Sequence, residues 1–229
     1  MDERTKALFR QAWPRQAAFV LFLAALMFIP AGTLRYWQGW LFLLVFVGSA
    51  IALGLYFTKH DPALIEGRIH AGPFAEQEPA QKVIVALLLA SLLLMIVVPA
   101  FDYRWHWSAE PAWLVILADA GIVASFVVFF FVMKQNSYAA ATVRAESGQP
   151  VISTGLYGVV RHPMYSGALL MMIGMPLALG SYWSLLLVIP ATAVLAWRLL
   201  DEERVLRRDL PGYADYCRQI RYRLIPGLW

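Results

Sequence analysis

The sequence predicts an all-α integral membrane protein with about six transmembrane helices. Hydrophobic residues make up 60% of its 229 residues and charged residues only 15%, which is more apolar surface than a soluble core of this size requires. The apolar residues gather in long runs, and the Lys and Arg residues gather on alternate connections between them. The chain has a single cysteine, which excludes an internal disulfide.

Four apolar runs predict the first four helices, at residues 17–34, 37–57, 83–101 and 113–133. Each run is close to the ~20 residues that cross a bilayer. A basic segment precedes the first run, as in a signal peptide, but the run is long and no small-residue cleavage site follows it. We therefore expect an anchor helix there and treat residues 1–133 as one N-terminal part.

A fifth uncharged stretch, residues 164–197, is too long for one crossing. As a single helix it would measure about 51 Å, against a hydrocarbon core of ~30 Å. We predict a hairpin of two short helices of about 16 residues each, with a turn at Gly180 and Ser181 and with Pro176 and Pro190 as kinks.

Six crossings put both termini on one side of the membrane. Of the 19 Lys and Arg residues, all but Arg35 and Arg104 fall on the N-terminus, the connections 58–82 and 134–164, and the tail. By the positive-inside rule these segments are cytoplasmic, so we expect a bacterial inner-membrane protein with a cytosolic helical tail from about residue 201. The net charge of +4 then reflects orientation, and neither a nucleic-acid partner nor a metal is expected.

Polar and aromatic residues concentrate directly before the hairpin. The segment from Gly155 to Tyr165 holds a tight turn, two phenol rings, Arg161 and His162. Such a set suits a polar cofactor, although a basic loop with an aromatic belt is also common where helices meet lipid headgroups. Residues 134–229 are therefore treated as a second, cofactor-binding part.

Charges return at the far end of the hairpin. Arg198 and Glu202 are four residues apart and share one face of a helix, on the side of the membrane that also carries Arg161 and His162. The hairpin predicts that the two groups meet. Arg198 would then face a cofactor or a lipid-embedded substrate.

The C-terminal half resembles the isoprenylcysteine carboxyl methyltransferase family of membrane enzymes, with its bacterial relatives and the related phospholipid N-methyltransferases. The first four helices match in hydropathy alone. The motifs that carry the resemblance occur in this order: Asn136, Val151 to Tyr157, Arg161 to Tyr165, Arg198, Glu202 and Glu203, Tyr213, Tyr216, and Arg223 to Pro226.

The resemblance implies an S-adenosylmethionine site without a Rossmann fold, and a methyltransferase acting on a lipophilic or lipid-linked acceptor in the membrane. It implies that Arg198 faces the methyl acceptor as the catalytic residue. Thr142 stands where the eukaryotic enzymes place a glutamine that contacts the cofactor. The residues expected to line the cofactor are Val151, Ile152, Tyr157, Arg161, His162, Pro163, Met164, Tyr165, Glu202 and Glu203.

The sequence leaves the acceptor open among an isoprenylcysteine carboxylate, a phospholipid amine, a small thiol and a quinone-like compound. Methyl transfer from a sulfonium is an in-line displacement, so the protein mainly aligns the reactants and excludes water. An ionised carboxylate needs no general base, and Arg198 could orient it through two parallel hydrogen bonds. A neutral amine or thiol must lose a proton, for which Glu203, Tyr213 and Tyr216 are candidates.

Two other functions remain as alternatives. Membrane sterol or enone reductases that use NADPH are similar in an arginine-histidine-proline loop and in a tail like Tyr216 to Pro226. The Glu202-Glu203 pair followed by Leu206 favours the methyltransferase. In addition, dinucleotide phosphates require more cations than Arg161 and Arg198 supply. A structural or transport-associated protein with a degenerate site is the third hypothesis.

Overall fold

The computed structural model describes residues 3–69, 79–138 and 149–229, and the side chains of these residues except 3–13 and 67–69. Every regular element in these ranges is a helix, as the sequence predicts. The elements are α1 (Glu3–Ala31), α2 (Trp37–His60), α3 (Pro62–Ile69), α4 (Pro79–Trp105), α5 (Ala112–Gln135), η1 (Gly155–Gly158), α6 (Pro163–Ala178), η2 (Trp183–Leu187), α7 (Val188–Asp209) and α8 (Tyr213–Gln219).

Five helical segments of the described chain are long and apolar enough to cross a membrane. Helix α6 has only 16 residues, or about 24 Å at 1.5 Å per residue, which is less than the ~30 Å of a hydrocarbon core. The protein is therefore an all-α integral membrane protein, and α6 is a shorter apolar helix of its bundle. The five segments are Pro14–Ala31, Trp37–His60, Pro79–Trp105, Ala112–Gln135 and Trp183–Asp209.

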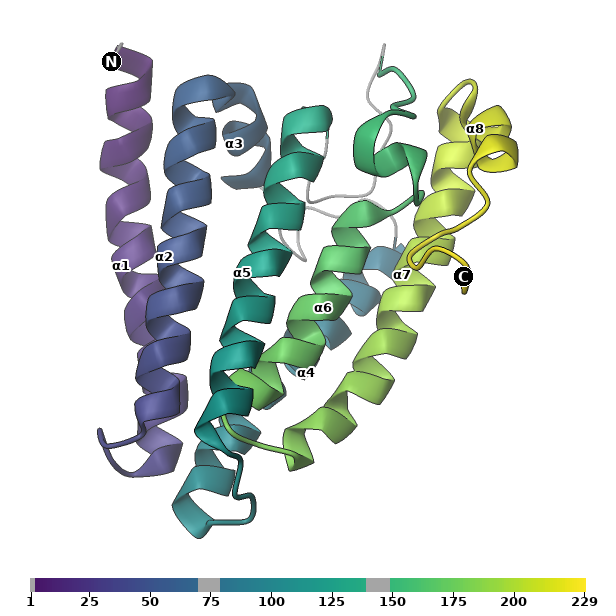
Figure 1. The fold of residues 1–229 in the computed structure, drawn as a ribbon. Helices are drawn as coiled ribbons and strands as arrows, with labels where there is room; N and C mark the ends of the chain where they lie inside the picture. The colour runs from purple at the N-terminus through teal and green to yellow at the C-terminus, as the bar shows by residue number, and fades with distance from the viewer. Residues whose placement is uncertain (1–2, 70–78, 139–148) are drawn as a thin grey trace.

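The helices form one bundle in which α5 packs between α2 and α6, while α4 runs behind α6 and contacts both α1 and α7 (Figure 1). A helix bonds its backbone groups within itself, which is what a lipid environment demands. The core draws on both the N-terminal and the C-terminal parts of the chain. Its most buried side chains include Met27, Tyr36, Phe42, Met95, Ile122 and Leu179.

Two glycines allow α6 to lie close against α5. A Cβ atom on Gly167 would stand 2.8 Å from Cε1 of Phe129, and one on Gly174 would stand 3.2 Å from Cδ1 of Ile122. The first distance is shorter than any ordinary carbon–carbon contact, so a side chain at Gly167 would push the helices apart. This close packing fixes the start of α6, where the polar motif lies.

The predicted hairpin is present, and its turn lies at Gly180 as expected. Gly180 has a φ of +74°, a left-handed conformation that glycine adopts without steric cost. The first arm has the predicted length, but the second is longer: α7 alone has 22 residues. Pro190 sits in the first turn of α7, where proline is tolerated.

The longer second arm changes the expected tail. A helical tail was predicted from about residue 201, and its first part, up to Asp209, is the continuous end of α7. The chain then turns at Gly212, which has a φ of +83°, into the short helix α8. Charged residues at the end of a spanning helix extend it out of the lipid, so a change from apolar to charged residues did not mark a helix end here.

The helix predicted at residues 83–101, which is α4 in the structure, also begins earlier than the sequence suggested. Residues 58–82 were expected to form a connection, but α3 occupies part of it and α4 starts at Pro79. Gln81 therefore belongs to α4, and its side chain is completely buried. Proline at the first position of a helix is favourable because its missing N–H would have no intrahelical partner.

A buried carboxylate ties the hairpin turn to α4 at the opposite end from α8. Asp102 accepts hydrogen bonds from the backbone N–H of Ser108 at 2.6 Å, from the hydroxyl of Ser108 at 2.7 Å and from the hydroxyl of Ser181 at 2.5 Å. Its exposed fraction is 0%. The contact anchors the turn between α6 and η2.

Candidate functional site

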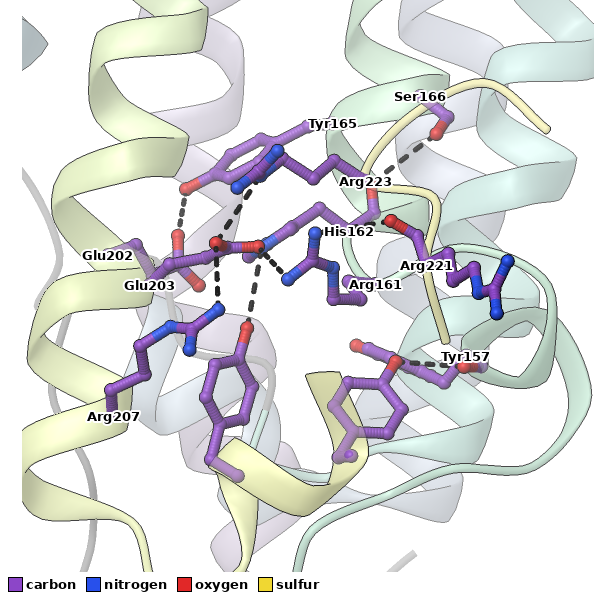
Figure 2. Close-up of polar contacts among 12 residues, drawn as sticks. Tyr157, Arg161, His162, Tyr165, Ser166, Glu202, Glu203, Arg207, Arg221 and Arg223 are labelled. Atoms are coloured by element: carbon purple, nitrogen blue, oxygen red, sulfur yellow. Dashed lines mark hydrogen bonds and ion pairs between the residues drawn. The ribbon is translucent and has the colours of Figure 1, made fainter. Parts of the chain in front are cut away.

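Glu203 of α7 is buried and lies at the centre of a cluster of basic side chains (Figure 2). Its Oε1 is 3.0 Å from Nη1 of Arg161 and 3.4 Å from Nε2 of His162. Its Oε2 is 3.3 Å from Nε of Arg223 and 3.8 Å from Nη2 of Arg207. A carboxylate that is 4% exposed is costly to bury alone, and these partners offset the cost.

The loop that carries Arg161 and His162 is held by the end of the chain through backbone pairing. The N–H of Arg161 donates to the carbonyl of Tyr222, and the N–H of His162 donates to the carbonyl of Arg223, both at 2.9 Å. A guanidinium nitrogen of Arg161 also donates to the carbonyl of Arg221 at 3.3 Å (Figure 2). The tail thus positions the loop, in which the segment from Val160 to Pro163 is buried.

The start of α6 sets the direction of the next side chains. Pro163 occupies the first helical position, where its fixed φ favours helix formation. The carbonyl of His162 accepts from the N–H groups of Tyr165 and Ser166. The Ser166 hydroxyl donates to the carbonyl of Leu224 at 2.6 Å, which adds another contact between α6 and the tail.

Tyr165 links α6 to α7. Its hydroxyl donates to the carboxylate of Glu202 and accepts from Nε of Arg198 at 3.0 Å. The ring lies nearly parallel to the His162 ring, with 5.6 Å between centroids and an angle of 18°. The structure therefore brings together the two motifs that the sequence placed at opposite ends of the hairpin.

Arg198 also contacts α4. Its Nη1 donates to Oε1 of Gln81 at 3.2 Å, and Nε2 of Gln81 donates to Oδ2 of Asp201 at 2.6 Å. Asp201 further accepts from Nη1 of Arg204 at 2.8 Å. Three helices, α4, α6 and α7, thus meet at the Arg198 guanidinium.

The loop around η1 is fastened to both α5 and α8. Nδ2 of Asn136 donates to the Tyr157 hydroxyl at 3.2 Å, and the Tyr216 hydroxyl donates to the Tyr157 carbonyl at 2.8 Å. The N–H of Leu156 donates to Oε1 of Gln135 at 3.0 Å. These bonds hold Tyr157 on the same side of the bundle as the Glu203 cluster (Figure 2).

The phenols of α8 are buried beside this loop. Tyr213 and Tyr216 pack with Leu210, and Val151 packs against them. Burial raises the pKa of Tyr213 and the pKa of Tyr216 above the ordinary tyrosine value, and neighbouring acidic groups add to the effect on Tyr213. Both phenols stay protonated at neutral pH, so neither suits the role of general base that the sequence left open for them.

The remaining predicted cofactor residues lie close in sequence to this cluster. Met164 packs against an apolar group that includes Phe57, Leu64 and Met133. Pro163 is buried and Ile152 is half-buried. Thr142 lies outside the described residues.

One buried donor in the cluster has no hydrogen-bond partner among the described residues. It is Nε of Arg161, which belongs to a side chain that is 6% exposed in total. A buried donor without a partner costs about 1–3 kcal/mol, so a ligand acceptor at this atom would be stabilised. The carboxylate of an amino-acid group such as the methionyl end of S-adenosylmethionine fits this requirement.

The sequence did not identify Gln81, Asp201, Arg204 or Arg207 as members of the polar cluster. Arg207 shares the spacing of four residues with Glu203 that helix ion pairs prefer, so its contact could have been predicted. Gln81 and Asp201 are far apart in sequence and come from different helices. Only the packing of α4 against α7 brings them together.

Comparisons with known proteins support a methyltransferase function for this region. Residues 113–210 match the family model described as phospholipid methyltransferase, a stretch that runs from α5 to the end of α7. The matched stretch covers less than half of the chain, and it contains both the Arg161 loop and the Arg198–Glu203 segment. The match supports a membrane methyltransferase, and the narrower isoprenylcysteine assignment stays a prediction.

A curated relative has a different activity. The Delta(14)-sterol reductase TM7SF2 of Mus musculus is 32% identical over 91 residues, which cover 38% of this chain and 22% of that protein. The chain therefore spans about a fifth of the length of this relative.

Proposed function

We propose that this protein is an S-adenosylmethionine-dependent methyltransferase whose acceptor is lipophilic and enters from the bilayer. One observation carries the proposal. The segment that matches the phospholipid methyltransferase family contains both the Arg161–Tyr165 motif and the Arg198–Glu203 segment, and Tyr165 joins them through its hydrogen bonds with Arg198 and Glu202. Buried charges within membrane helices are costly and usually functional.

The residues on the Arg161 side suit the polar parts of the methyl donor. Nε of Arg161 is a buried donor with no partner among the described residues, and the methionyl carboxylate would supply an acceptor for it once the neighbouring side chains move aside to admit the ligand. The Glu202 carboxylate can accept from an ammonium group or from ribose hydroxyls. The apolar side chains of Val151 and Ile152, with the ring of Tyr157, suit the adenine.

Arg198 is proposed to orient the acceptor. The bound donor would supply an electrophilic methyl group on a sulfonium, and the transfer needs the acceptor atom in line with it. A guanidinium presents parallel donors that match a carboxylate. Arg198 is 8% exposed, so the acceptor would meet it in a site from which most water is excluded.

The three candidate general bases, Glu203, Tyr213 and Tyr216, limit the chemical class of the methyl acceptor. Tyr213 and Tyr216 have raised pKa values because they are buried, and Glu203 already interacts with Arg161, His162 and Arg223. None of these groups suits the removal of a proton from a neutral amine or thiol. We therefore favour an acceptor that is already ionised, such as a carboxylate on a lipid-like chain.

An NADPH-dependent membrane reductase is the second candidate, because of the identity with the sterol reductase. The charges of the cluster argue against it. Arg161, Arg207 and Arg223 all contact Glu203, whereas a dinucleotide needs cations directed at its phosphates.

Calorimetry on the purified protein in nanodiscs tests the proposal and separates the two candidates. We expect saturable binding of S-adenosylhomocysteine and no binding of NADPH. His162→Ala and Glu202→Ala should each weaken that binding strongly, whereas Asp215→Ala, which changes an exposed side chain of α8, should not. Binding of NADPH without S-adenosylhomocysteine would replace this proposal with the reductase.

A further inference from the structure

Gln81 lies at the beginning of α4, far in sequence from the polar motifs, and it is the most buried polar side chain that touches Arg198. Its exposed fraction is 0%. Its amide bridges two residues of α7, accepting from Nη1 of Arg198 at 3.2 Å and donating to Oδ2 of Asp201 at 2.6 Å. Helix α4, which runs behind α6 (Figure 1), thus contacts Arg198 through the Gln81 side chain.

The chemistry of Asp201 dictates which way the amide points. An ionised carboxylate only accepts hydrogen bonds, so the nitrogen of the Gln81 amide must face Asp201. Its oxygen is then directed at Arg198, which only donates. The reverse orientation would put two acceptors together at one end and two donors at the other.

Two hydrogen bonds from different helices fix the plane of the Arg198 guanidinium. Nε donates to the Tyr165 hydroxyl of α6 at 3.0 Å, and Nη1 donates to Gln81 of α4. A guanidinium is planar and rigid, so bonds at two of its nitrogens define the rotation of the whole group. Removing either hydrogen bond removes one of the contacts that hold the group in this orientation.

We propose that Gln81 is a positioning residue for Arg198, and that Asp201 acts through it by setting the orientation of its amide. The inference rests on the proposed role of Arg198 toward the acceptor. The Asp201 carboxylate of α7 thus orients the Gln81 amide of α4, and that amide in turn orients the Arg198 guanidinium of α7.

Four variants separate this role from simple packing. Gln81→Met keeps the length of the side chain and removes both hydrogen bonds. Asp201→Asn keeps the shape of Asp201 and lets the Gln81 amide take either orientation. The double variant Gln81→Glu with Asp201→Asn reverses the direction of the hydrogen bond between positions 81 and 201. The amide introduced at position 201 can donate to the carboxylate introduced at position 81, and that carboxylate still accepts from Arg198. The control is Arg204→Gln, which removes the other partner of Asp201 from a side chain that is 78% exposed.

Nitrogen NMR of arginine side chains tests the positioning without any acceptor. The Arg198 signal is assigned by its disappearance in Arg198→Lys. We expect slow rotation of its terminal nitrogens in the wild type, in Arg204→Gln and in the double variant, and faster rotation in Gln81→Met and Asp201→Asn. Unchanged rotation in Gln81→Met would overturn the proposal.

Kinetics test the consequence for turnover, with N-acetyl-S-farnesylcysteine as the acceptor probe. We expect kcat in Gln81→Met and in Asp201→Asn to fall about 10- to 100-fold, the range that a small misplacement of a catalytic group produces, while S-adenosylhomocysteine affinity stays near that of the wild type. The double variant should recover most of the activity. A decrease confined to cofactor affinity, or no recovery, would contradict a positioning role.

The wild type distinguishes failure of the acceptor probe from failure of the proposed function. If it binds S-adenosylhomocysteine but does not methylate this probe, the chosen acceptor is wrong. If it does not bind S-adenosylhomocysteine, the proposed function fails, and in both cases the NMR result still decides the role of Gln81.

Discussion

The Tyr165 hydroxyl receives a hydrogen bond from Nε of Arg198 at 3.0 Å and donates to Glu202. One phenol at the start of α6 therefore joins the residue proposed to face the acceptor to a residue proposed to face the cofactor. In methyl transfer these two sides must be aligned along one line. The contact spans the two arms of the hairpin, so the alignment depends on how α6 and α7 pack.

Removing the Tyr165 hydroxyl should lower both the affinity for the cofactor and the rate of methyl transfer. Tyr165→Phe leaves Arg198 and Glu202 without their shared partner, and a buried polar group that loses its partner costs about 1–3 kcal/mol. We expect lower affinity for S-adenosylhomocysteine by calorimetry and a lower kcat. Tyr182→Phe, on a side chain that is 44% exposed, should match the wild type, and equal behaviour of the two variants would contradict the role of Tyr165.

Glu203 should be important for stability as well as for the site. Glu203→Gln removes the charge that Arg161, Arg207 and Arg223 surround, and breaking a buried ion pair costs about 3–5 kcal/mol. We expect a clear drop in the thermal unfolding midpoint in detergent. Asp209→Asn is the matched control, because its pair with Arg208 is exposed and exposed ion pairs contribute little to stability. Similar midpoints for the two variants would refute the importance of the cluster.

The Asp102 contact should matter for folding and not for cofactor binding. Asp102→Ala leaves the donors of Ser108 and Ser181 without their acceptor, at a cost of about 1–3 kcal/mol. We expect a lower unfolding midpoint with unchanged S-adenosylhomocysteine affinity once the protein is folded. A weaker affinity at a temperature where the variant is folded would show that the two ends of the bundle are coupled.

Stability should decrease in alkaline solution because of the α8 phenols. The pKa of Tyr213 is raised in the folded protein by burial, whereas an unfolded tyrosine ionises near pH ~10. The raised value contributes stability that is complete below pH ~10 and is lost as the pH rises further, because only the unfolded state ionises readily. Tyr213→Phe should therefore flatten the decrease in unfolding midpoint above pH ~10, measured by circular dichroism. The same decrease in wild type and variant would contradict this assignment.

The orientation of the protein can be tested with single cysteines, since Cys217 is the only cysteine in the chain. In a Cys217→Ser background, Arg218→Cys reports on the end of the bundle that carries α8, and Arg35→Cys reports on the other end. We expect a membrane-impermeant maleimide to label Arg35→Cys in intact bacterial cells and to label Arg218→Cys only after the cells are opened. The opposite pattern would place the candidate site outside the cytoplasm.

The sequence predicted most of the helices because the bilayer imposes a simple rule on it. A run of about 20 apolar residues must be a helix in lipid, and the uncharged stretch 164–197 was too long to be anything but a hairpin. Helix ends were less predictable, as α4 and α7 show. Polar residues such as Gln81 and Asp201 lie within helices whose ends pass beyond the apolar run.

For the site, the sequence by itself determined which segments carry the chemistry: the Arg161–Tyr165 motif, Arg198 and Glu202 were all selected from their order along the chain. Tertiary structure decided which groups touch. Arg161 and His162 contact Glu203, the tail carbonyls of Tyr222 and Arg223 hold the loop, and Gln81 reaches Arg198 from α4. Helical periodicity fixes neighbours only within one helix, whereas contacts between helices depend on packing details, such as the missing side chain at Gly167, that no local pattern encodes.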